Sequence, residues 1–263
     1  MKKKLAAIIF AMPLSLLALM PAAAQDEEED TSPYVVPVDT FTCSYNEGKD
    51  RSDLDKVVAD WNAHLDEQGA DTYGAYIMTP NYHGDDTFEV GWLGFWTSQE
   101  AMGAGIDSYR ANSGDMDARF ASVLTCNSHE HWATVQLKAP PEGGPPDELV
   151  LLFSNCTRGE GVEYDTLFEA IGKATAYWTE QGSTSGQWAM WPVFGGGGDP
   201  GWDFKWVTSF ANYTEFGKAY QHSANGGGRQ AMNEIYGDMI DCDASRVYDA
   251  TTVRRAKWAS DDE

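Results

Sequence analysis

Apolar residues between Phe88 and Trp96 occupy both alternating positions of a strand-like stretch. In FEVGWLGFW, one parity carries a phenylalanine, a valine and two tryptophans, while the other carries Leu93 and Phe95. Side chains of a strand point alternately to the two faces of a sheet. Both faces of this strand are therefore expected to be buried, which requires packed layers on either side of its sheet.

Periodicity predicts the elements around this strand. Alternating and apolar runs predict strands over DTFTCSY (39–45), YGAYIMTP (73–80) and HWATVQLK (131–138). Apolar residues at helical spacing predict a helix over 52–68, with Ser52 opening a capping box and Gly69 ending the helix. A second helical region is expected to open at Thr97.

The chain repeats itself at a nearly constant interval. Identical residues recur in the same order, between 112 and 116 positions apart: Cys43 and Cys156, Met78 and Met190, Trp92 and Trp206, Gly103 and Gly217, Cys126 and Cys242. APPEGGPPDE (139–148) is a Pro/Gly-rich linker between the copies. We expect one βαββαβ unit over 40–138 and a second over 149–256, flanked by acidic segments at 25–39 and 257–263.

The second copy shows the same order of patterns. Strands are predicted over 149–155, 186–194, 201–210 and 246–253, a helix around Leu167 to Trp178, and a helical region from 212 to 240 broken at 226–228. One face of its third strand is aromatic, whereas Asp203, Lys205 and Ser209 occupy the other. This polar parity predicts either a polar pocket between sheet and helices or an edge that reaches solvent.

The element order is that of ferredoxin-like folds, in which both helices cover one face of an antiparallel sheet. The chain resembles the dimeric α+β barrel superfamily. There, antibiotic-biosynthesis-type monooxygenases and stress-responsive barrel proteins pair two such units, and chlorite-dismutase-like haem proteins carry two in one chain. The resemblance spans Thr40 to about Arg255 and is one of topology and repetition, so no catalytic residue is carried over. It implies an α+β fold of two tandem ferredoxin-like units, packed sheet to sheet as an intramolecular barrel.

The first 24 residues are typical of a secretory signal peptide. They combine a basic start, an apolar run from Leu5 to Met20 and the small residues Ala22 to Ala24. A membrane anchor is the weaker interpretation, because the run is short and contains Pro13. We expect a periplasmic or secreted protein that has no membrane association after cleavage.

Charge excludes one class of partner. The formal net charge is −23, and loss of Lys2, Lys3 and Lys4 with the signal peptide makes it −26. Such a chain repels nucleic acid and anionic membranes. Its carboxylates are spread along the sequence instead of being grouped at cation-binding spacing, so their expected role is solubility.

The four cysteines allow three disulfide connectivities. In a βαββαβ unit the last strand lies antiparallel beside the first. Cys43 lies near the end of one first strand and Cys126 just before the last strand of its unit, and Cys156 and Cys242 repeat this relation. We therefore predict one bridge in each unit, Cys43–Cys126 and Cys156–Cys242, formed in an oxidising compartment.

Histidines are the candidate metal ligands. His129 and His131 are two residues apart and would share a strand face, while His83, Asp85 and Asp86 fall in one turn. The alternatives are exposed strand-end histidines and ordinary turn chemistry. No third ligand follows from spacing, so no metal site is predicted.

The family resemblance makes His222 a candidate haem ligand, since chlorite-dismutase-like proteins ligate haem through a histidine of the second unit. A solvated histidine at a helix end is the alternative. No cofactor follows from the residues themselves.

The sequence identifies no reaction, because no acids, bases or nucleophiles recur at catalytic spacing. The glycine-rich GGGGDPG (195–201) joins two strands and is read as a hairpin tip that could cover an entrance. Three roles remain: a module that binds a small apolar or aromatic molecule, a monooxygenase-like or haem enzyme, and a partner-binding exported protein. For the first role the predicted site comprises Trp178, Asp203, Lys205, Ser209, Tyr220 and His222.

Overall fold

The computed structural model describes residues 34–84, 88–141, 144–196 and 200–258. The predicted signal peptide (1–24), Asp85, Asp86 and part of the glycine-rich hairpin lie outside these residues. No helix in the described residues is long and apolar enough to span a bilayer.

The chain contains two successive sets of strands and helices. The first set is β1 (Val35–Tyr45), α1 (Arg51–Glu67), β2 (Tyr73–Tyr82), β3 (Val90–Trp96), α2 (Gln99–Asn112), α3 (Met116–Ala121) and β4 (Leu124–Lys138). The second set is β5 (Glu148–Arg158), α4 (Tyr164–Glu180), β6 (Gly186–Phe194), β7 (Phe204–Phe210), α5 (Tyr213–Asn225), α6 (Gly228–Tyr236), β8 (Ile240–Cys242) and β9 (Arg246–Arg254).

Eight antiparallel strands close into a barrel. Their order is β7-β6-β4-β1-β3-β2-β9-β5, and β5 pairs again with β7 to complete the ring. Among the described residues, the short β8 pairs with β5 alone. The pairings β4–β6 and β2–β9 join the two halves edge to edge. The predicted intramolecular α+β barrel is therefore present, with the halves hydrogen-bonded at their edges and their bare faces lining one interior.

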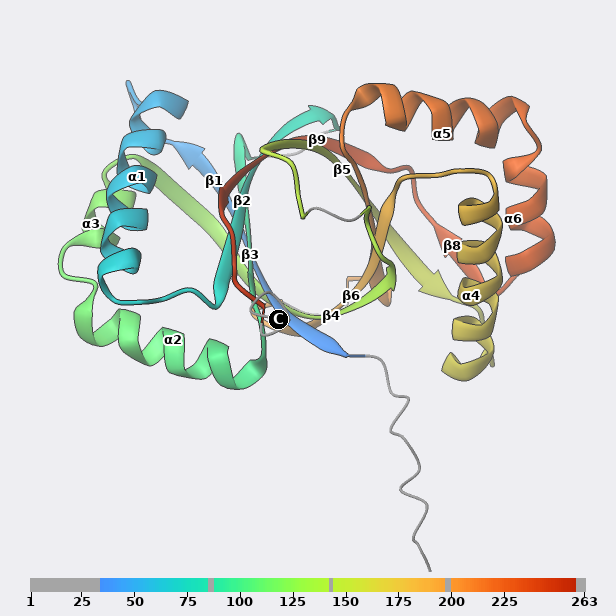
Figure 1. The fold of residues 1–263 in the computed structure, drawn as a ribbon, viewed down its shortest axis with the longest axis horizontal. Helices are drawn as coiled ribbons and strands as arrows, with labels where there is room; N and C mark the ends of the chain where they lie inside the picture. Colours follow the sequence, from blue (N-terminus) through green and yellow to red (C-terminus); the bar gives the residue numbers. More distant parts are fainter. Residues whose placement is uncertain (1–33, 85–87, 142–143, 197–199, 259–263) are drawn as a thin grey trace, which may run out of the picture. The chain divides into compact units, whose positions relative to one another are not determined.

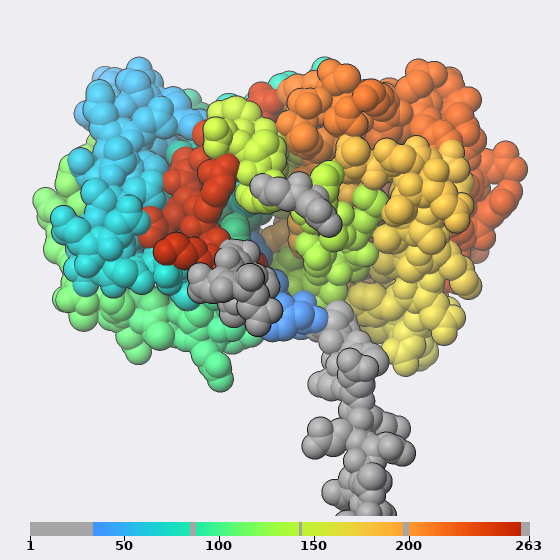
Figure 2. All heavy atoms as spheres, in the orientation of Figure 1, coloured from blue at the N-terminus to red at the C-terminus, as the bar shows by residue number. Residues whose placement is uncertain are grey.

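Helices cover the outer surface of the barrel on opposite sides (Figure 1). Helices α1, α2 and α3 flank the first half, and α4, α5 and α6 flank the second. In the space-filling view, the blue-to-green residues of the first half and the yellow-to-orange residues of the second half lie on opposite sides of the barrel (Figure 2). Each strand therefore contacts helices on its outer face and barrel core on its inner face.

This arrangement accounts for the two apolar faces of β3. Val90, Trp92 and Trp96 pack outward with the core beneath α1 and α3. Leu93 and Phe95 point inward and join the core of the barrel. Phe88 also packs in the barrel core, contrary to its sequence parity, because β3 begins only at Val90.

Several predicted element boundaries are wrong by a few residues. β1 begins at Val35, inside the segment (25–39) assigned to the acidic terminus, because its valines pack in the barrel. Asp50, not Ser52, caps α1, since its side chain accepts hydrogen bonds from the first backbone N–H groups. Gly69 does end this helix, with a φ of 65°.

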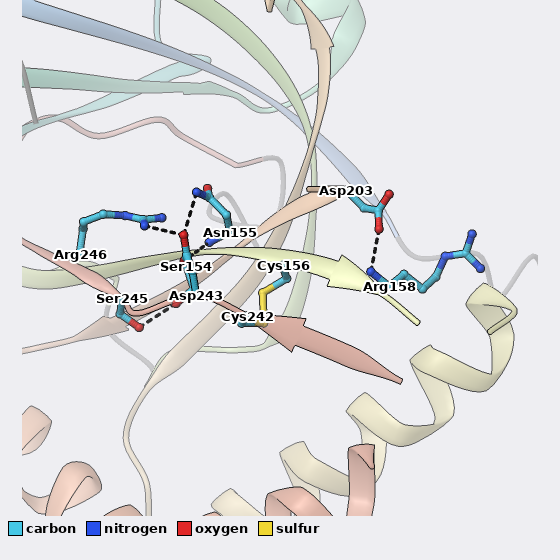
Figure 3. The surroundings of a disulfide bond; sticks show 9 residues. All are labelled: Ser154, Asn155, Cys156, Arg158, Asp203, Cys242, Asp243, Ser245 and Arg246. Atoms are coloured by element: carbon cyan, nitrogen blue, oxygen red, sulfur yellow. Dashed lines mark hydrogen bonds and ion pairs between the residues drawn. A yellow bond between two sulfur atoms is a disulfide. The ribbon is translucent and has the colours of Figure 1, made fainter. Parts of the chain in front are cut away.

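Both predicted disulfides are present. Cys43 lies opposite Cys126 on β1 and β4, and Cys156 lies opposite Cys242 on β5 and β8. Polar contacts surround the second bridge, where Asn155 donates its backbone and side-chain N–H groups to Asp243 (Figure 3). Each bridge thus links the first strand of its half to the segment before the last strand, as the repeat predicts.

Candidate functional site

A cavity of about 250 Å³ lies between the sheet of the second half and helices α4 and α5. Its apolar lining is Leu152, Trp178, Phe210, Phe216, Ala219 and Tyr220. Trp178 and Tyr220 belong to the site predicted from the sequence. A concave, mainly apolar space with a few polar groups is the usual form of a small-molecule site.

The polar lining consists of neutral groups, namely Ser183, Ser185, Gln187, Thr208 and Ser223. The hydroxyl oxygens of Ser183 and Ser185 are 3.0 Å apart. Gln187 is only 8% exposed, yet its side-chain amide makes no hydrogen bond within the described part of the chain. Its amide atoms are not completely buried, so water or a ligand in the cavity can satisfy them.

Lys138 lies directly behind this polar wall. Its ammonium group donates to the carbonyl oxygens of Ser183 and Ser185, at 3.0 and 2.6 Å. The residue is 9% exposed, and burial lowers the pKa of its side chain. No ion pair joins it to a carboxylate of the described residues, so its charge is balanced only by carbonyl dipoles.

A register shift brings Lys138 to this position. From Trp132 to Gln136 β4 alternates regularly, and Trp132 points into the barrel. The pairing with β6 shifts between Gln136 and Lys138, which places Lys138 opposite Gln187 on the face towards the helices. An extra residue in one strand reverses the facing of the residues beyond it.

The turn after α4 completes the wall. Gly182 has a φ of 71°, which favours glycine, and the N–H of Ser183 donates to the carbonyl of Trp178. Opposite this turn, Asn212 caps α5 by accepting a hydrogen bond from Glu215. The helix then presents Phe216, Ala219 and Tyr220 to the cavity.

The corresponding region of the first half is filled. Phe210 on β7 corresponds to Trp96 on β3, and Ala219 on α5 corresponds to Gly105 on α2, both at an interval of 114. A Cβ added at Gly105 would lie 2.1 Å from the Trp96 ring, so the indole packs directly against the helix backbone. The smaller Phe210 ring leaves space in the second half.

Three predicted site residues do not contribute to this cavity. Lys205 points into the barrel, where its ammonium lies 4.4 Å from the ring centre of Trp202 and donates to Asn155. Ser209 lies on the same face of β7 as Lys205. Asp203 accepts a hydrogen bond from the backbone N–H of Arg158. The expectation that these residues face the helices is wrong, because the alternate residues of β7, among them Phe204 and Trp206, pack against the helices.

His222 lies beside the cavity but does not line it. Its Nε2 is 2.7 Å from the Tyr177 hydroxyl, and its Nδ1 faces Gly226, where an added Cβ would be 2.5 Å away. Both ring nitrogens therefore face groups of the protein. These residues do not fit an axially ligated haem.

The two strand histidines form a separate cluster on the outside of the barrel. His131 Nδ1 is 2.8 Å from Asp39 Oδ1, and His129 Nε2 is 3.7 Å from the same oxygen. They share a face as predicted, although the His131 side chain is only 13% exposed. No group of three or more metal-coordinating side chains suited to an ion occurs among the residues the structure describes.

A larger cavity of about 510 Å³ lies between the C-terminal end of α1 and β9. Its charged groups form ion pairs, Arg254 with Asp66, Arg255 with Asp147 and Lys257 with Asp71, although Arg254 Nε is buried without a hydrogen-bond partner among the described residues. Because its charges are paired, this space is the weaker candidate for a ligand site.

Comparison with known proteins identifies the fold. The chain aligns with a candidate chlorite dismutase designated TA0507 at 10% identity and a TM-score of 0.51, covering 83% of this chain and 95% of that protein. It aligns with a mutant of the chlorite dismutase from Candidatus Nitrospira defluvii at 11% identity and a TM-score of 0.50, covering 83% and 92%. The chain has the fold of the dimeric α+β barrel superfamily.

Other comparisons add little to this result. A candidate monooxygenase from Lactobacillus acidophilus aligns at 10% identity over 85% of this chain and 96% of its own, with a TM-score of 0.49. No protein-family model and no curated protein matches the sequence. At these identities the likeness concerns the fold alone.

Sequence reasoning missed the polar wall. Lys138 is the last residue of a strand pattern whose parity would place it inside the barrel, and Gln187 lies within an otherwise apolar strand. The polar Gln187 in the stretch GQWAMWPVF was the one available signal.

Proposed function

We propose that the protein binds a small apolar or aromatic molecule in the cavity between β6, β7, α4 and α5. The observation that carries this proposal is an aromatic-lined space that the first half fills with Trp96 and the second half leaves open. Apolar walls supply affinity, and the few polar groups orient the ligand. Trp178 and Tyr220 are the residues of the predicted site that support it.

Reproducing the packing of the first half in the second half tests this proposal. The double variant Phe210→Trp/Ala219→Gly places an indole against a glycine, as Trp96 and Gly105 do in the first half. We expect the wild-type protein to bind one equivalent of indole in isothermal titration calorimetry and the variant to bind at least about tenfold more weakly. The variant should retain its melting temperature, because the substituted pair reproduces an existing packing.

A control variant separates cavity filling from added aromatic surface. Gln221→Trp adds an indole at an exposed position of α5 that does not line the cavity. Its affinity for indole should equal that of the wild type. Equal binding by the filled variant would show that indole binds elsewhere.

An enzymatic role is the second candidate, and its support is the likeness in fold to chlorite dismutases. The haem form of this role is the weaker one, because His222 is engaged by Tyr177. An absorption spectrum of protein purified from its own host tests it, since a Soret band would favour haem. A structural or partner-binding role would replace both if no small molecule binds.

We further propose that the chain is exported and that each half is a ferredoxin-like unit. Two disulfides support an oxidising compartment. The strand orders β4-β1-β3-β2 and β9-β5-β7-β6 support the second interpretation, because both follow the same pattern. Intact mass of the secreted protein should correspond to a chain that begins at Gln25, and a retained segment 1–24 would contradict export.

A further inference from the structure

We propose that the cavity selects aromatic carboxylates, with Gln187 and Lys138 determining this specificity. This inference rests on the proposed binding function and names the chemical class of its ligand. Gln187 would donate to a carboxylate oxygen, and the buried charge of Lys138 behind the wall would favour an anion over a neutral group of the same shape.

The amide of Gln187 is the first observation. It is more than nine-tenths buried, it lines the cavity, and it makes no hydrogen bond within the described residues. Its NH₂ group can donate two hydrogen bonds. The amide atoms of Gln187 are not among the completely buried polar atoms that lack a partner, so they are accessible from the cavity, where a ligand can accept these hydrogen bonds.

The charge of Lys138 is the second observation. Its Nζ is bonded to the carbonyls of two residues that line the cavity, so the ammonium group lies one backbone layer behind them. Burial weakens solvent screening of such a charge. In a chain with a formal net charge of −23, Lys138 supplies a positive charge at this wall.

Neighbouring charges do not cancel this positive charge. Glu215 approaches the same turn by accepting a hydrogen bond from Thr184 at 3.0 Å. It also forms an ion pair with Lys218 at 2.7 Å, and these hydrogen bonds lower the pKa of Glu215. The Glu215–Lys218 pair is neutral as a unit, and none of the described residues that line the cavity carries a charge.

The distribution of the lining determines which part of the ligand lies where. Gln187, Ser183 and Ser185 form the polar wall on the side of Lys138, and the hydroxyl groups of the two serines can also donate to an anion. The rings of Trp178 and Phe216 contribute the aromatic lining. A molecule with a planar ring and a carboxylate satisfies both parts, whereas a cation would be repelled by Lys138.

Benzoate and benzamide provide a direct test, because they share shape and size and differ in charge at pH 7. We expect the wild-type protein to bind benzoate at least about tenfold more tightly than benzamide in calorimetric titrations at low salt. The preference should shrink as salt is added, although less than for an exposed charge. Equal affinities, or tighter binding of benzamide, would overturn the inference while leaving the binding function intact.

Substitutions assign the preference to residues. Lys138→Met should bring the benzoate-to-benzamide ratio close to one, with benzamide affinity changed less than about twofold. Lys173→Met is the matched control, since it removes the same charge from an exposed position of α4 and should leave the ratio unchanged. Gln187→Met should weaken benzoate binding by about tenfold or more. If Lys138→Met and Gln187→Met both bind benzoate as tightly as the wild type does, the roles of Lys138 and Gln187 are refuted.

Two outcomes separate this inference from the proposed function. If neither benzoate, benzamide nor indole binds to the folded wild-type protein, the binding function fails and the inference fails with it. If indole binds and the filled variant Phe210→Trp/Ala219→Gly loses it, the function stands, and the benzoate-to-benzamide ratio alone decides the inference. The wild-type ratio requires no substitution, so misfolding of a variant cannot obscure the result.

Discussion

Replacing Gln187 by methionine is expected to stabilise the protein while weakening its proposed activity. Methionine has a similar length and no amide group, so the change removes a polar group, on a residue that is only 8% exposed, that has no hydrogen-bond partner in the described residues. An unsatisfied buried polar group costs about 1–3 kcal/mol. Because the amide faces a cavity that water can enter, we expect the free energy of unfolding to rise by about 0.5–2 kcal/mol.

Guanidinium denaturation followed by circular dichroism and by fluorescence measures this change. The midpoint should increase with an unchanged m value. For a domain of this size, 1 kcal/mol corresponds to about 2–4 °C, so the melting temperature should rise by roughly 1–8 °C. The same variant should lose affinity for benzoate, because the group that stabilises the bound carboxylate is also the one that destabilises the empty protein.

A glutamine that has a partner provides the contrast. Gln99 donates its side-chain N–H to the carbonyl of Val35 at 2.9 Å. Gln99→Met removes a hydrogen bond and should lower the free energy of unfolding by about 0.5–1.5 kcal/mol. If Gln187→Met destabilises the protein as much as Gln99→Met does, the amide of Gln187 has a partner in the native state and the reasoning is refuted.

Three further predictions concern stability. Cys43→Ser or Cys156→Ser opens a bridge that spans 83 or 86 positions, and each variant should lose about 4–5 kcal/mol of unfolding free energy on the chain-entropy estimate. Denaturation without reductant measures this loss, and a loss below about 1 kcal/mol in both variants would contradict the estimate. Gly195→Ala should destabilise by about 1–3 kcal/mol, because Gly195 has a φ of 84° and an added Cβ would lie 2.1 Å from a carbonyl oxygen of β4, whereas Gly196→Ala, with open space, should be neutral in the same assay. Burial lowers the pKa of Lys138 below its ordinary 10.5, so between the two pKa values the unfolded state binds more protons than the folded state. The free energy of unfolding of the wild type, relative to Lys138→Met, should therefore increase as the pH rises towards 10.5. A difference that does not change with pH would argue against a buried charge.

Patterns local to the chain were sufficient for most of the fold. The interval between Cys43 and Cys156 placed the second copy, and the shared position of the cysteines in each copy gave both disulfides. The two apolar parities around Trp92 correctly required layers on both faces of the sheet. These inferences succeeded because helical and strand periods are properties of consecutive residues, and because a repeated sequence repeats its fold.

The candidate site was only partly accessible to the same reasoning. Trp178 and Tyr220 were predicted as helix residues facing Asp203, Lys205 and Ser209; they line the cavity, although Lys205 and Ser209 face the barrel instead. Lys205 was assigned to the wrong side of its sheet, since parity along a strand does not reveal which face meets the helices. In the structure its ammonium lies in the barrel beside Trp202.

The sequence by itself determined the repeat, the order of the elements, the disulfide partners and the α+β class, because each follows from residues at fixed spacing. Only the tertiary structure decided where the polar wall lies. The register shift before Lys138 reverses its facing, and the closure of β4 onto β6 brings it opposite Gln187, almost fifty residues further along the chain. A one-residue irregularity in a strand leaves no periodic signal, yet it moves a charge from the barrel interior to the edge of a cavity.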